Sequence, residues 1–134
     1  GGGARVAILN AALGLEYATI VQFPPLINSC QDQESAAKLQ WLVMDSLRHA
    51  NMVSNHIKRW GGEPEWTLKP LPQGEDFLGL LEYQKVLEME TSRLYEVALP
   101  LSDNPEMERD LKTLITAEQK HYSILEDVIA RLSR

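Results

Sequence analysis

Apolar residues recur at alternating spacings of three and four along four stretches of the chain, at about residues 4–23, 33–60, 76–99 and 105–132. Such a pattern forms one continuous stripe on a helix and is typical of helices that pack in a bundle. No stretch shows the sustained alternation of a half-buried strand. The pattern therefore predicts an all-α fold of four long helices. The stripe of the first stretch consists of Val6, Leu9, Leu13, position 16, Ile20 and Phe23.

Proline residues mark the ends of two of these helices. Pro24 and Pro25 are expected to end or kink the first helix, because proline lacks the N–H donor and its ring clashes with the preceding turn. The segment 102–105, with the sequence SDNP, predicts a stop, a cap and a proline at the first position of the last helix.

The connection between the second and third helices, residues 61–75, is long for a bundle, in which such links span about 2–8 residues. Fully extended, it reaches roughly 50 Å, whereas a helix of about 24 residues is about 36 Å long. The connection can therefore run the length of the bundle. The sequence predicts one long crossover, with the second and third helices parallel, rather than an up-down array.

Ionisable residues interrupt the apolar stripe of every predicted helix. Burying such groups costs free energy unless they are paired, hydrogen-bonded or bound to a metal. Their place in the stripes makes them candidates for a common buried site. The five residues at these positions are Glu16, His49, Glu88, Glu118 and His121.

The spacing of these residues reveals an internal repeat. Glu16 precedes His49 by 33 residues, and Glu88 precedes His121 by the same number. An offset of 72 residues places the apolar stripes of one half on those of the other. The sequence therefore predicts two similar helical hairpins related by a pseudo-twofold axis, with all five ionisable side chains at the same depth.

The residue types at these positions indicate a metal site. Carboxylate oxygens and neutral imidazoles suit iron, manganese or zinc, and the spacing of Glu118 and His121 places both on one face of a helix. A Glu from each of two helices, together with a Glu-x-x-His motif, is the donor arrangement of di-iron carboxylate bundles. The alternative is a network of buried salt bridges and hydrogen bonds. It is disfavoured because these stripe positions offer no Lys or Arg apart from Lys85, one turn before Glu88.

Several segments resemble the bacterioferritins and rubrerythrins of the ferritin-like superfamily. Residues 9–17 (LNAALGLEY), with Gln22 and Phe23, resemble the first helix of bacterioferritins. Residues 44–50 (MDSLRHA), running on to 61–64 (GGEP), resemble their second helix. The EQKH segment at 118–121 is similar to the fourth-helix Glu-x-x-His of both families. The resemblance covers nearly the whole chain and implies a ferritin-like four-helix bundle.

The resemblance also implies a role for each of the five ionisable residues. Glu16 and His49 would serve one metal, Glu88 and His121 would serve the other, and Glu118 would bridge the two. The cofactor implied is iron, as a pair or as a single ion, with manganese as the alternative.

Two positions depart from the family pattern. The second bridging glutamate of the family falls at Ser46, and the methionine that binds bacterioferritin haem falls at Leu47. We therefore expect no haem of that kind. With only three glutamates, two divalent metals would keep a net positive charge and an open coordination position. Hydroxide, peroxide or another small anion could fill that position.

The expected function is that of a non-haem iron or manganese carboxylate protein with oxidase or peroxidase chemistry on O2 or peroxide. Two alternatives remain open. One is a metal-binding or iron-handling protein without turnover, and the other is a degenerate bundle that serves as a structural or interaction module.

For each of three further residues, the sequence allows two interpretations of its role. Asp45, one turn before His49, either orients that imidazole or pairs with Arg48 in solvent. The preferred interpretation of Tyr95 is a packing residue, and the alternative is that its hydroxyl forms a hydrogen bond near the site. His56 lies two turns, about 10 Å, beyond His49, which is too far for the same metal. A satisfied core histidine is the better interpretation of His56.

The composition of the chain limits the kinds of partner and the cellular setting that we expect. The formal charge of −6 and the pI near 5.0 argue against a nucleic-acid partner. No uninterrupted apolar run reaches about 18 residues, so we expect no membrane-spanning segment. Cys30 is the only cysteine, which excludes an intrachain disulfide and favours a cytoplasmic setting. The glycines at 1–3 resemble an expression-tag remnant, leaving a single domain at 4–134. A homodimer is expected from the family resemblance.

Overall fold

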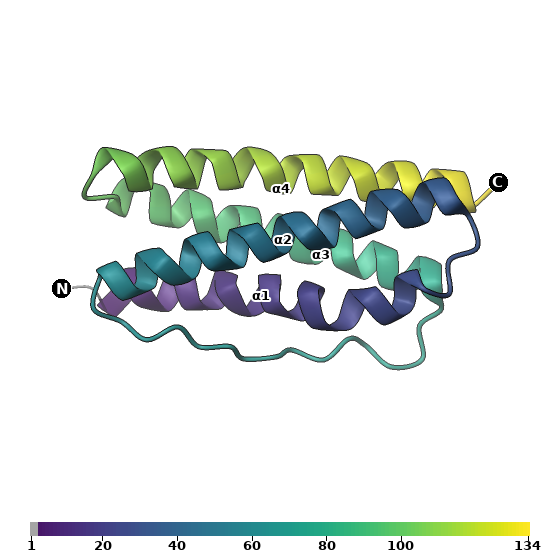
Figure 1. Ribbon diagram of the computed structural model, residues 1–134, viewed down its shortest axis with the longest axis horizontal. Helices are drawn as coiled ribbons and strands as arrows, with labels where there is room; N and C mark the ends of the chain where they lie inside the picture. Colours follow the sequence, from purple (N-terminus) through teal and green to yellow (C-terminus); the bar gives the residue numbers. More distant parts are fainter. Residues whose placement is uncertain (1–2) are drawn as a thin grey trace.

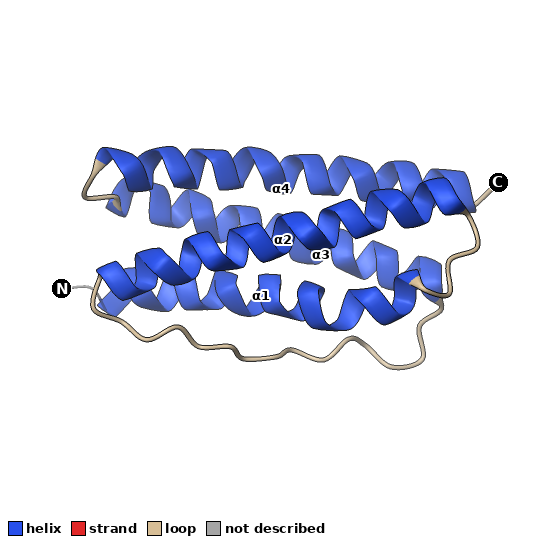
Figure 2. Cartoon of the chain, viewed as in Figure 1, coloured by secondary structure: helices blue, strands red, loops and turns tan. Residues whose placement is uncertain are grey.

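The computed structural model describes residues 3–134, which form four long α-helices and no strand within that range (Figures 1 and 2). The predicted all-α class is confirmed, and the helix bounds agree to within one residue except at the end of the first helix. Of the expected tag remnant at residues 1–3, residues 1–2 lie outside the described range, and Gly3 is the first residue of α1. The elements are α1 (Gly3–Ile27), α2 (Gln33–Arg59), α3 (Phe77–Ala98), a 3-10 turn η1 (Leu99–Leu101) and α4 (Pro105–Leu132).

The long connection crosses the bundle from end to end. In Figure 1, α2 and α3 run in the same direction, and residues 61–76 follow the length of α1 as an extended strap. α1 packs with α2 as one antiparallel hairpin, and α3 packs with α4 as the other. The structure therefore confirms the single crossover and the parallel α2 and α3.

The strap is attached to the bundle near its start by Asn10 of α1. The Asn10 Nδ2 donates to the Glu63 carbonyl at 3.1 Å, and the Asn10 Oδ1 accepts from the Glu65 amide at 2.8 Å. The residue between these two is Pro64, which has no amide hydrogen of its own. One side-chain amide thus satisfies the backbone polar groups on both sides of a proline.

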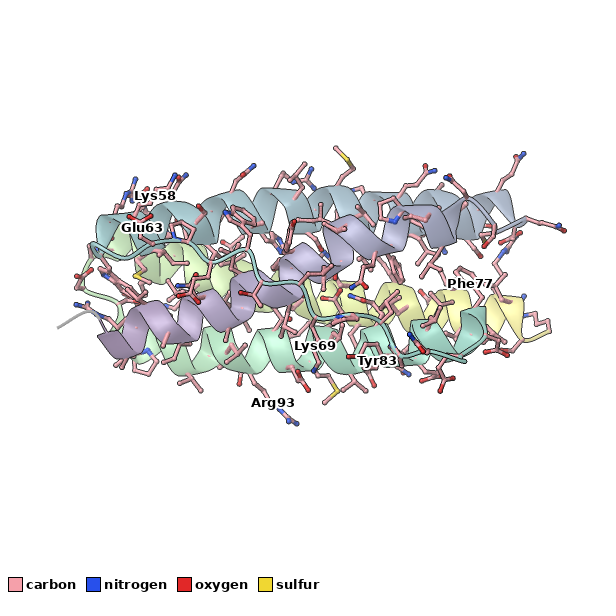
Figure 3. All side chains as sticks on the ribbon, turned by 90° about the horizontal axis from the view of Figure 1, so that it is seen from below. Lys58, Glu63, Lys69, Phe77, Tyr83 and Arg93 are labelled. Atoms are coloured by element: carbon pink, nitrogen blue, oxygen red, sulfur yellow. The ribbon has the colours of Figure 1, made fainter. Side chains whose placement is uncertain are left out.

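Gln22 repeats this arrangement farther along the strap. Its Nε2 donates to the Lys69 carbonyl at 2.8 Å, and its Oε1 accepts from the Leu71 amide at 2.9 Å, on either side of Pro70. Figure 3 shows the strap passing along α1 between the labelled residues Glu63 and Lys69. Backbone that lacks regular secondary structure needs such partners, because unpaired polar groups at a packed surface cost free energy.

Each of these two attachments is expected to protect one strap amide from hydrogen exchange. Asn10→Ala should speed exchange at Glu65, and Gln22→Ala should speed it at Leu71, because each variant removes the acceptor of that amide. Each should lower the free energy of unfolding by about 1–2 kcal/mol, since two hydrogen bonds are lost at about 1 kcal/mol each. Hydrogen exchange followed by NMR measures this, and each variant is the control for the other. Equal exchange at both amides in both variants would contradict local attachment.

The first helix is longer than predicted. α1 continues through Pro24 and Pro25 to Ile27, so the predicted end at residue 23 is wrong. Ile27 is only 4% exposed, and the Asn28 amide donates to the Pro24 carbonyl at 3.3 Å. Burying an isoleucine stabilises by about 1.5–3 kcal/mol, which offsets part of the roughly 3 kcal/mol that each of the two prolines costs inside a helix. Tertiary burial therefore carries the helix past the prolines.

Side-chain caps fix the starts of the other three helices. Asp32, Asp76 and Asn104 precede α2, α3 and α4, and each accepts a backbone N–H of the first turn at 2.8–3.1 Å. Such caps satisfy amide groups that have no partner within the helix. Pro105 occupies the first position of α4, as the SDNP segment predicts.

A polar layer divides the apolar core into two clusters. One cluster contains Leu9 and Leu111, and the other contains Leu39 and Leu81. Under the 72-residue offset, Leu9 corresponds to Leu81 and Leu39 to Leu111, so each residue and its counterpart lie in opposite clusters. A twofold axis perpendicular to the bundle produces this exchange. The predicted relation between the two hairpins is therefore confirmed.

α1 is the one described helix that is long and apolar enough to cross a membrane, with a mean hydropathy of 1.4 over 18 residues. A core helix of a soluble protein passes the same test. In this fold α1 is one of the four bundle helices, and its buried residues include Glu16. The expectation that no segment spans a membrane stays a prediction.

Candidate metal centre

The five ionisable stripe residues meet in the polar layer between the two core clusters. Glu16 comes from α1, His49 from α2, Glu88 from α3, and Glu118 with His121 from α4. None of the five is more than 4% exposed. They converge because the stripe of each helix faces the bundle axis and the pseudo-twofold axis brings both halves to one depth.

Glu118 lies between two Glu–His pairs. The Nδ1 of His49 is 3.2 Å from Glu16 Oε2 and 3.0 Å from Glu118 Oε1. The Nδ1 of His121 is 3.3 Å from Glu88 Oε2 and 3.5 Å from Glu118 Oε2. Within each triad the potential ligand atoms lie within 4.8 Å of one another. Glu118 belongs to both triads and offers one oxygen to each histidine.

Asp45 contacts both histidines through the ring nitrogens that face away from the glutamates. Its Oδ2 is 2.7 Å from the Nε2 of His121 and 3.3 Å from the Nε2 of His49, and the two imidazoles stack at 5.3 Å. Its Oδ1 accepts from Arg48 at 2.7 Å. Asp45 thus contacts both His49 and Arg48, but it is buried and not in solvent, and His121 is an additional partner. A carboxylate that accepts the Nε2–H leaves the Nδ1 lone pair available to a metal.

Glu16 and Glu88 are each held by one further buried side chain. The Tyr95 hydroxyl donates to Glu16 Oε2 at 2.8 Å, so Tyr95 does form a hydrogen bond at the site. The Gln84 Nε2 donates to Glu88 Oε1 at 3.0 Å and to the Thr19 hydroxyl at 2.8 Å. Sequence reasoning assigned Gln84 no role. The signal that could have identified it is an amide on the apolar stripe, one turn before Glu88.

Ser46 faces the interior of the bundle. It is completely buried, and its hydroxyl has no hydrogen-bond partner among residues 3–134. Ser46 precedes His49 on α2 by three residues, as Glu118 precedes His121 on α4. Buried hydroxyls without a partner are uncommon. The position therefore matches that of a second bridging carboxylate, which serine does not supply.

The crowded carboxylates determine where protons lie when no cation is bound. Burial, followed by the nearby charges of Glu16 and Glu88, raises the pKa of Glu118 well above its usual range. Burial also acts to raise the pKa of Glu88, but hydrogen bonds with Glu118 and His121 lower it overall. Burial favours neutral His121, yet Glu88 and Asp45 raise its pKa to about 9. Without a cation, the site thus favours the protonated forms of Glu118 and His121.

These features fit a pair of divalent metals. The donor set of three carboxylates and two imidazoles suits iron or manganese. The Oε2 of Glu118 is buried and has no hydrogen-bond partner in the described part of the chain. A purely structural network could pair that oxygen only through a proton on Glu118, which Glu88 would accept. A cation between the triads would instead bind it and replace the protons on Glu118 and His121. That these residues bind a metal stays a prediction.

Metal binding is expected to release protons and to tighten as the pH rises, because the proton on His121 and that on Glu118 compete with the cation. Calorimetric titration of metal-free protein with Co(II), in buffers of different ionisation enthalpy, counts the protons released. No release at pH 7 would contradict the assignment.

The metal-free protein should also have a lower free energy of unfolding at alkaline pH. The raised pKa of His121, about 9 against 6.5, contributes stability that is fully present below pH 6.5 and is lost as the pH rises through 9. Metal-free protein should therefore melt at a lower temperature at pH 9 than at pH 6.5. The metal-loaded protein should show a smaller change, because its His121 carries no competing proton.

His56 lies outside the centre, as expected. Its Nε2 is 2.6 Å from the Asp110 Oδ2, which joins α2 to α4. The interpretation of His56 as a satisfied core histidine is confirmed. Leu47, at the position of the haem-binding methionine, has a side chain exposed on the outer surface of α2. The expectation of no haem stays a prediction.

The chain matches no protein-family model, and no curated protein sequence matches it significantly. Solved structures do match. A ferritin-like, di-iron carboxylate protein from Bacillus anthracis is 25% identical, with a TM-score of 0.85 over 95% of this chain and 96% of that one. A bacterioferritin from Rhodobacter capsulatus is 26% identical, with a TM-score of 0.81 over 100% of this chain and 88% of that one.

A third structure, a dodecameric thioferritin from Bacteroides fragilis, is 17% identical, with a TM-score of 0.82 over 100% of this chain and 89% of that one. At this identity the likeness concerns the fold alone. All three comparisons agree with the single-crossover bundle and with the order of its helices. The chain therefore has the ferritin-like four-helix-bundle fold, and it is similar to di-iron carboxylate proteins and bacterioferritins of known structure.

Proposed function

We propose that this protein binds two iron ions, or manganese ions, and reacts with O2 or peroxide as an oxidase or peroxidase. Glu16 and His49 would hold one ion, Glu88 and His121 the other, and Glu118 would bridge them. The observation that carries the proposal is the position of Glu118, which belongs to both Glu–His triads and has one buried oxygen without a hydrogen-bond partner among residues 3–134.

The surrounding residues orient the ligand side chains and keep water out of the layer. Asp45 accepts the Nε2–H of His121, which directs the Nδ1 lone pair toward the glutamates. Tyr95 and Gln84 each donate a hydrogen bond that fixes the orientation of Glu16 or Glu88. The two apolar clusters exclude water from both ends of the layer. A bound iron pair would supply the electrons for reduction of O2 or peroxide.

Ser46 supports a second candidate, a metal-binding protein without turnover. Three glutamates neutralise three of the four positive charges of two divalent ions. A fourth carboxylate at position 46 would complete the balance. Without it, either an exogenous anion completes the ligand set or the second ion binds weakly. A weakly held second ion would favour metal handling over catalysis.

Metal analysis of the purified protein is the first experiment. Iron or manganese at close to two per chain, together with O2 or peroxide consumption by the reduced protein, supports the leading proposal. Bound metal without consumption supports metal handling. A protein that takes up neither metal after incubation with both would instead be a degenerate bundle with a structural role.

We also propose an oligomeric state and a cellular setting, both of which the sequence led us to expect. The first is assembly: a homodimer, or a larger oligomer such as the dodecamer named for the Bacteroides fragilis protein, would be detected by light scattering. The second is a cytoplasmic setting, which the single cysteine, Cys30, favours.

A further inference from the structure

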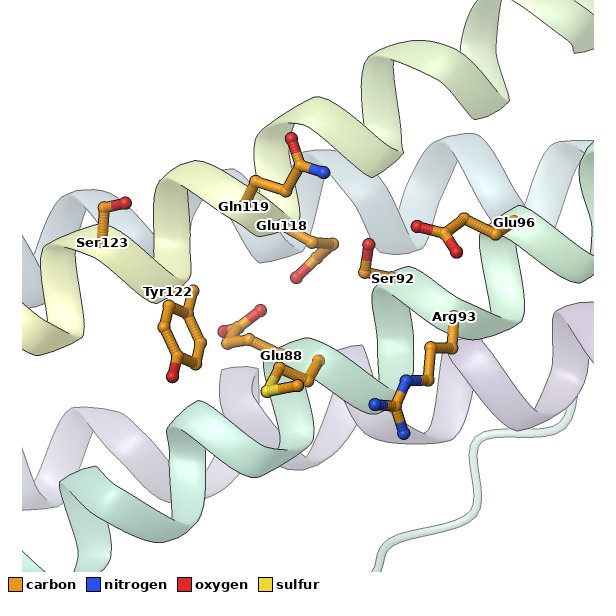
Figure 4. Close-up of a pocket in the computed structure, with 9 residues that line it drawn as sticks. Glu88, Ser92, Arg93, Glu96, Glu118, Gln119, Tyr122 and Ser123 are labelled. Carbon is orange, nitrogen blue, oxygen red and sulfur yellow. The ribbon is translucent and has the colours of Figure 1, made fainter.

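A groove between α3 and α4 reaches the candidate metal centre from the surface. Its volume is about 500 Å³, and the carboxylates of Glu88 and Glu118 face each other at its inner end (Figure 4). Ser92 and Gln119 line it farther out. Within residues 3–134, further grooves beside the strap, near the end of α1 and between α2 and α4 are lined by residues outside the centre.

The groove exists because one position in a ridge of α3 is small. Glu88, Ser92 and Glu96 are spaced by four residues, so their side chains form one row along the helix. The serine between the two glutamates leaves the space that a larger side chain would fill. On α4, Gln119 directly follows Glu118 and is exposed to solvent.

The equivalent place on the other hairpin carries larger apolar residues. The 72-residue offset relates Ser92 to Ile20 and Gln119 to Leu47. Ile20 packs against the core cluster that contains Leu9. The pseudo-twofold axis would give the centre two equivalent approaches, but large apolar residues occupy one and small or polar residues the other. The open approach therefore arises from the particular residues of α3 and α4 and not from the fold.

The charges along the groove favour a cation. Glu96 lies at the outer end, and Glu88 and Glu118 lie at the inner end, whereas Arg93 is the one basic residue of the lining. Figure 4 shows the Arg93 guanidinium lying apart from the two inner carboxylates. Glu118, whose buried Oε2 accepts no hydrogen bond from residues 3–134, lines this inner end and offers an oxygen ligand to a cation. Clefts lined by one sign of charge concentrate counter-ions and speed their association.

We infer that the α3–α4 groove is the access route by which a divalent cation reaches Glu88 and Glu118, with Ser92 and Gln119 controlling its width. The inference rests on the proposed metal-binding function, since a route matters only if the centre takes up cations. It goes beyond that function by naming the path and the residues that keep it open.

The experiment measures the rate of Co(II) uptake by metal-free protein, followed by stopped-flow absorbance, together with the final Co(II) content. Ser92→Ile and Gln119→Leu copy into the open approach the residues at the equivalent place on the other hairpin. Each should slow uptake by at least about tenfold, the lower end of the rate gain that a focusing cleft provides, at unchanged final content. Thr116→Ile is the matched control, because Thr116 is an exposed helical residue of the groove between α2 and α4.

Three outcomes would overturn the inference, and they are distinguishable. Wild-type uptake rates in both Ser92→Ile and Gln119→Leu would show that cations enter elsewhere. Equal slowing by Thr116→Ile would show an effect unrelated to the groove. Failure of the wild-type protein to bind Co(II) at all would reject the metal-binding function, and the access route with it. If the buried Ser92→Ile variant does not fold, the exposed position 119 still decides the question.

Discussion

Glu118→Gln is expected to abolish the bound metal pair while leaving the fold intact. The substitution keeps the size of the side chain but removes the negative charge shared by both triads. Metal affinity should fall by at least about 100-fold, the upper end of the loss seen when only a supporting residue is changed. Glu118→Ala, which removes the bridge altogether, should reduce metal content most of all. Metal analysis after dialysis against a fixed free concentration measures both.

Glu118→Gln should also be more stable than the wild-type protein when no metal is present. Burial and the charges of Glu16 and Glu88 raise the pKa of Glu118, so its ionised form is unfavourable in the fold. A neutral amide avoids that penalty, and unfolding should need more denaturant. Glu126→Gln, at an exposed position of the same helix, is the control and should change neither property. Wild-type metal content in Glu118→Ala would reject the bridging role.

Ser46→Glu is expected to change stability in opposite directions with and without metal. Ser46 is fully buried on the inward face of α2, and glutamate is a good helix former, so the helix itself should accept the change. Without metal, a fourth carboxylate in the layer should destabilise the fold by about 3 kcal/mol or more, as an unpaired buried charge does. With iron or manganese, the carboxylate can bind the cations, and the variant should hold closer to two metals per chain.

Ser46→Gln separates the charge from the added volume. If overpacking alone matters, the glutamine and glutamate variants should lose the same stability under both conditions. Denaturant unfolding in the presence of a chelator or of Mn(II) gives the comparison. A Ser46→Glu protein destabilised equally in both conditions, at unchanged metal stoichiometry, would show that position 46 does not face a metal site.

The contacts that refine the centre required the tertiary structure. Tyr95 bonds Glu16, 79 residues away in sequence, and Asp45 bonds His121, 76 residues away. Spacing along one helix gives the face on which a residue lies but not its partner on another helix. That partner depends on the rotation and axial shift of each helix, which core packing sets. The same reason explains why Asn10 was not foreseen as an attachment point of the strap.

One correction and one feature that the sequence did not predict share this origin. Helical propensity and proline chemistry are local, and they placed the end of the first helix at residue 23. The burial of Ile27, which keeps α1 helical through Pro24 and Pro25, depends on α2 and α4 being in place. The open approach beside Ser92 likewise depends on how two helices pack. A small residue in one helix does not indicate which residues of the neighbouring helix face it.

The sequence by itself determined the four helices, the crossover and the five residues at the centre. Each rests on a property that is one-dimensional: the period of apolar residues, the reach of residues 61–75, and the cost of burying charges such as Glu16 and Glu88. The tertiary structure alone decided which oxygen meets which nitrogen, what holds the strap and where the surface opens to the centre. Those are relations between elements, and they exist only once the packing of the core has fixed how the helices lie against one another.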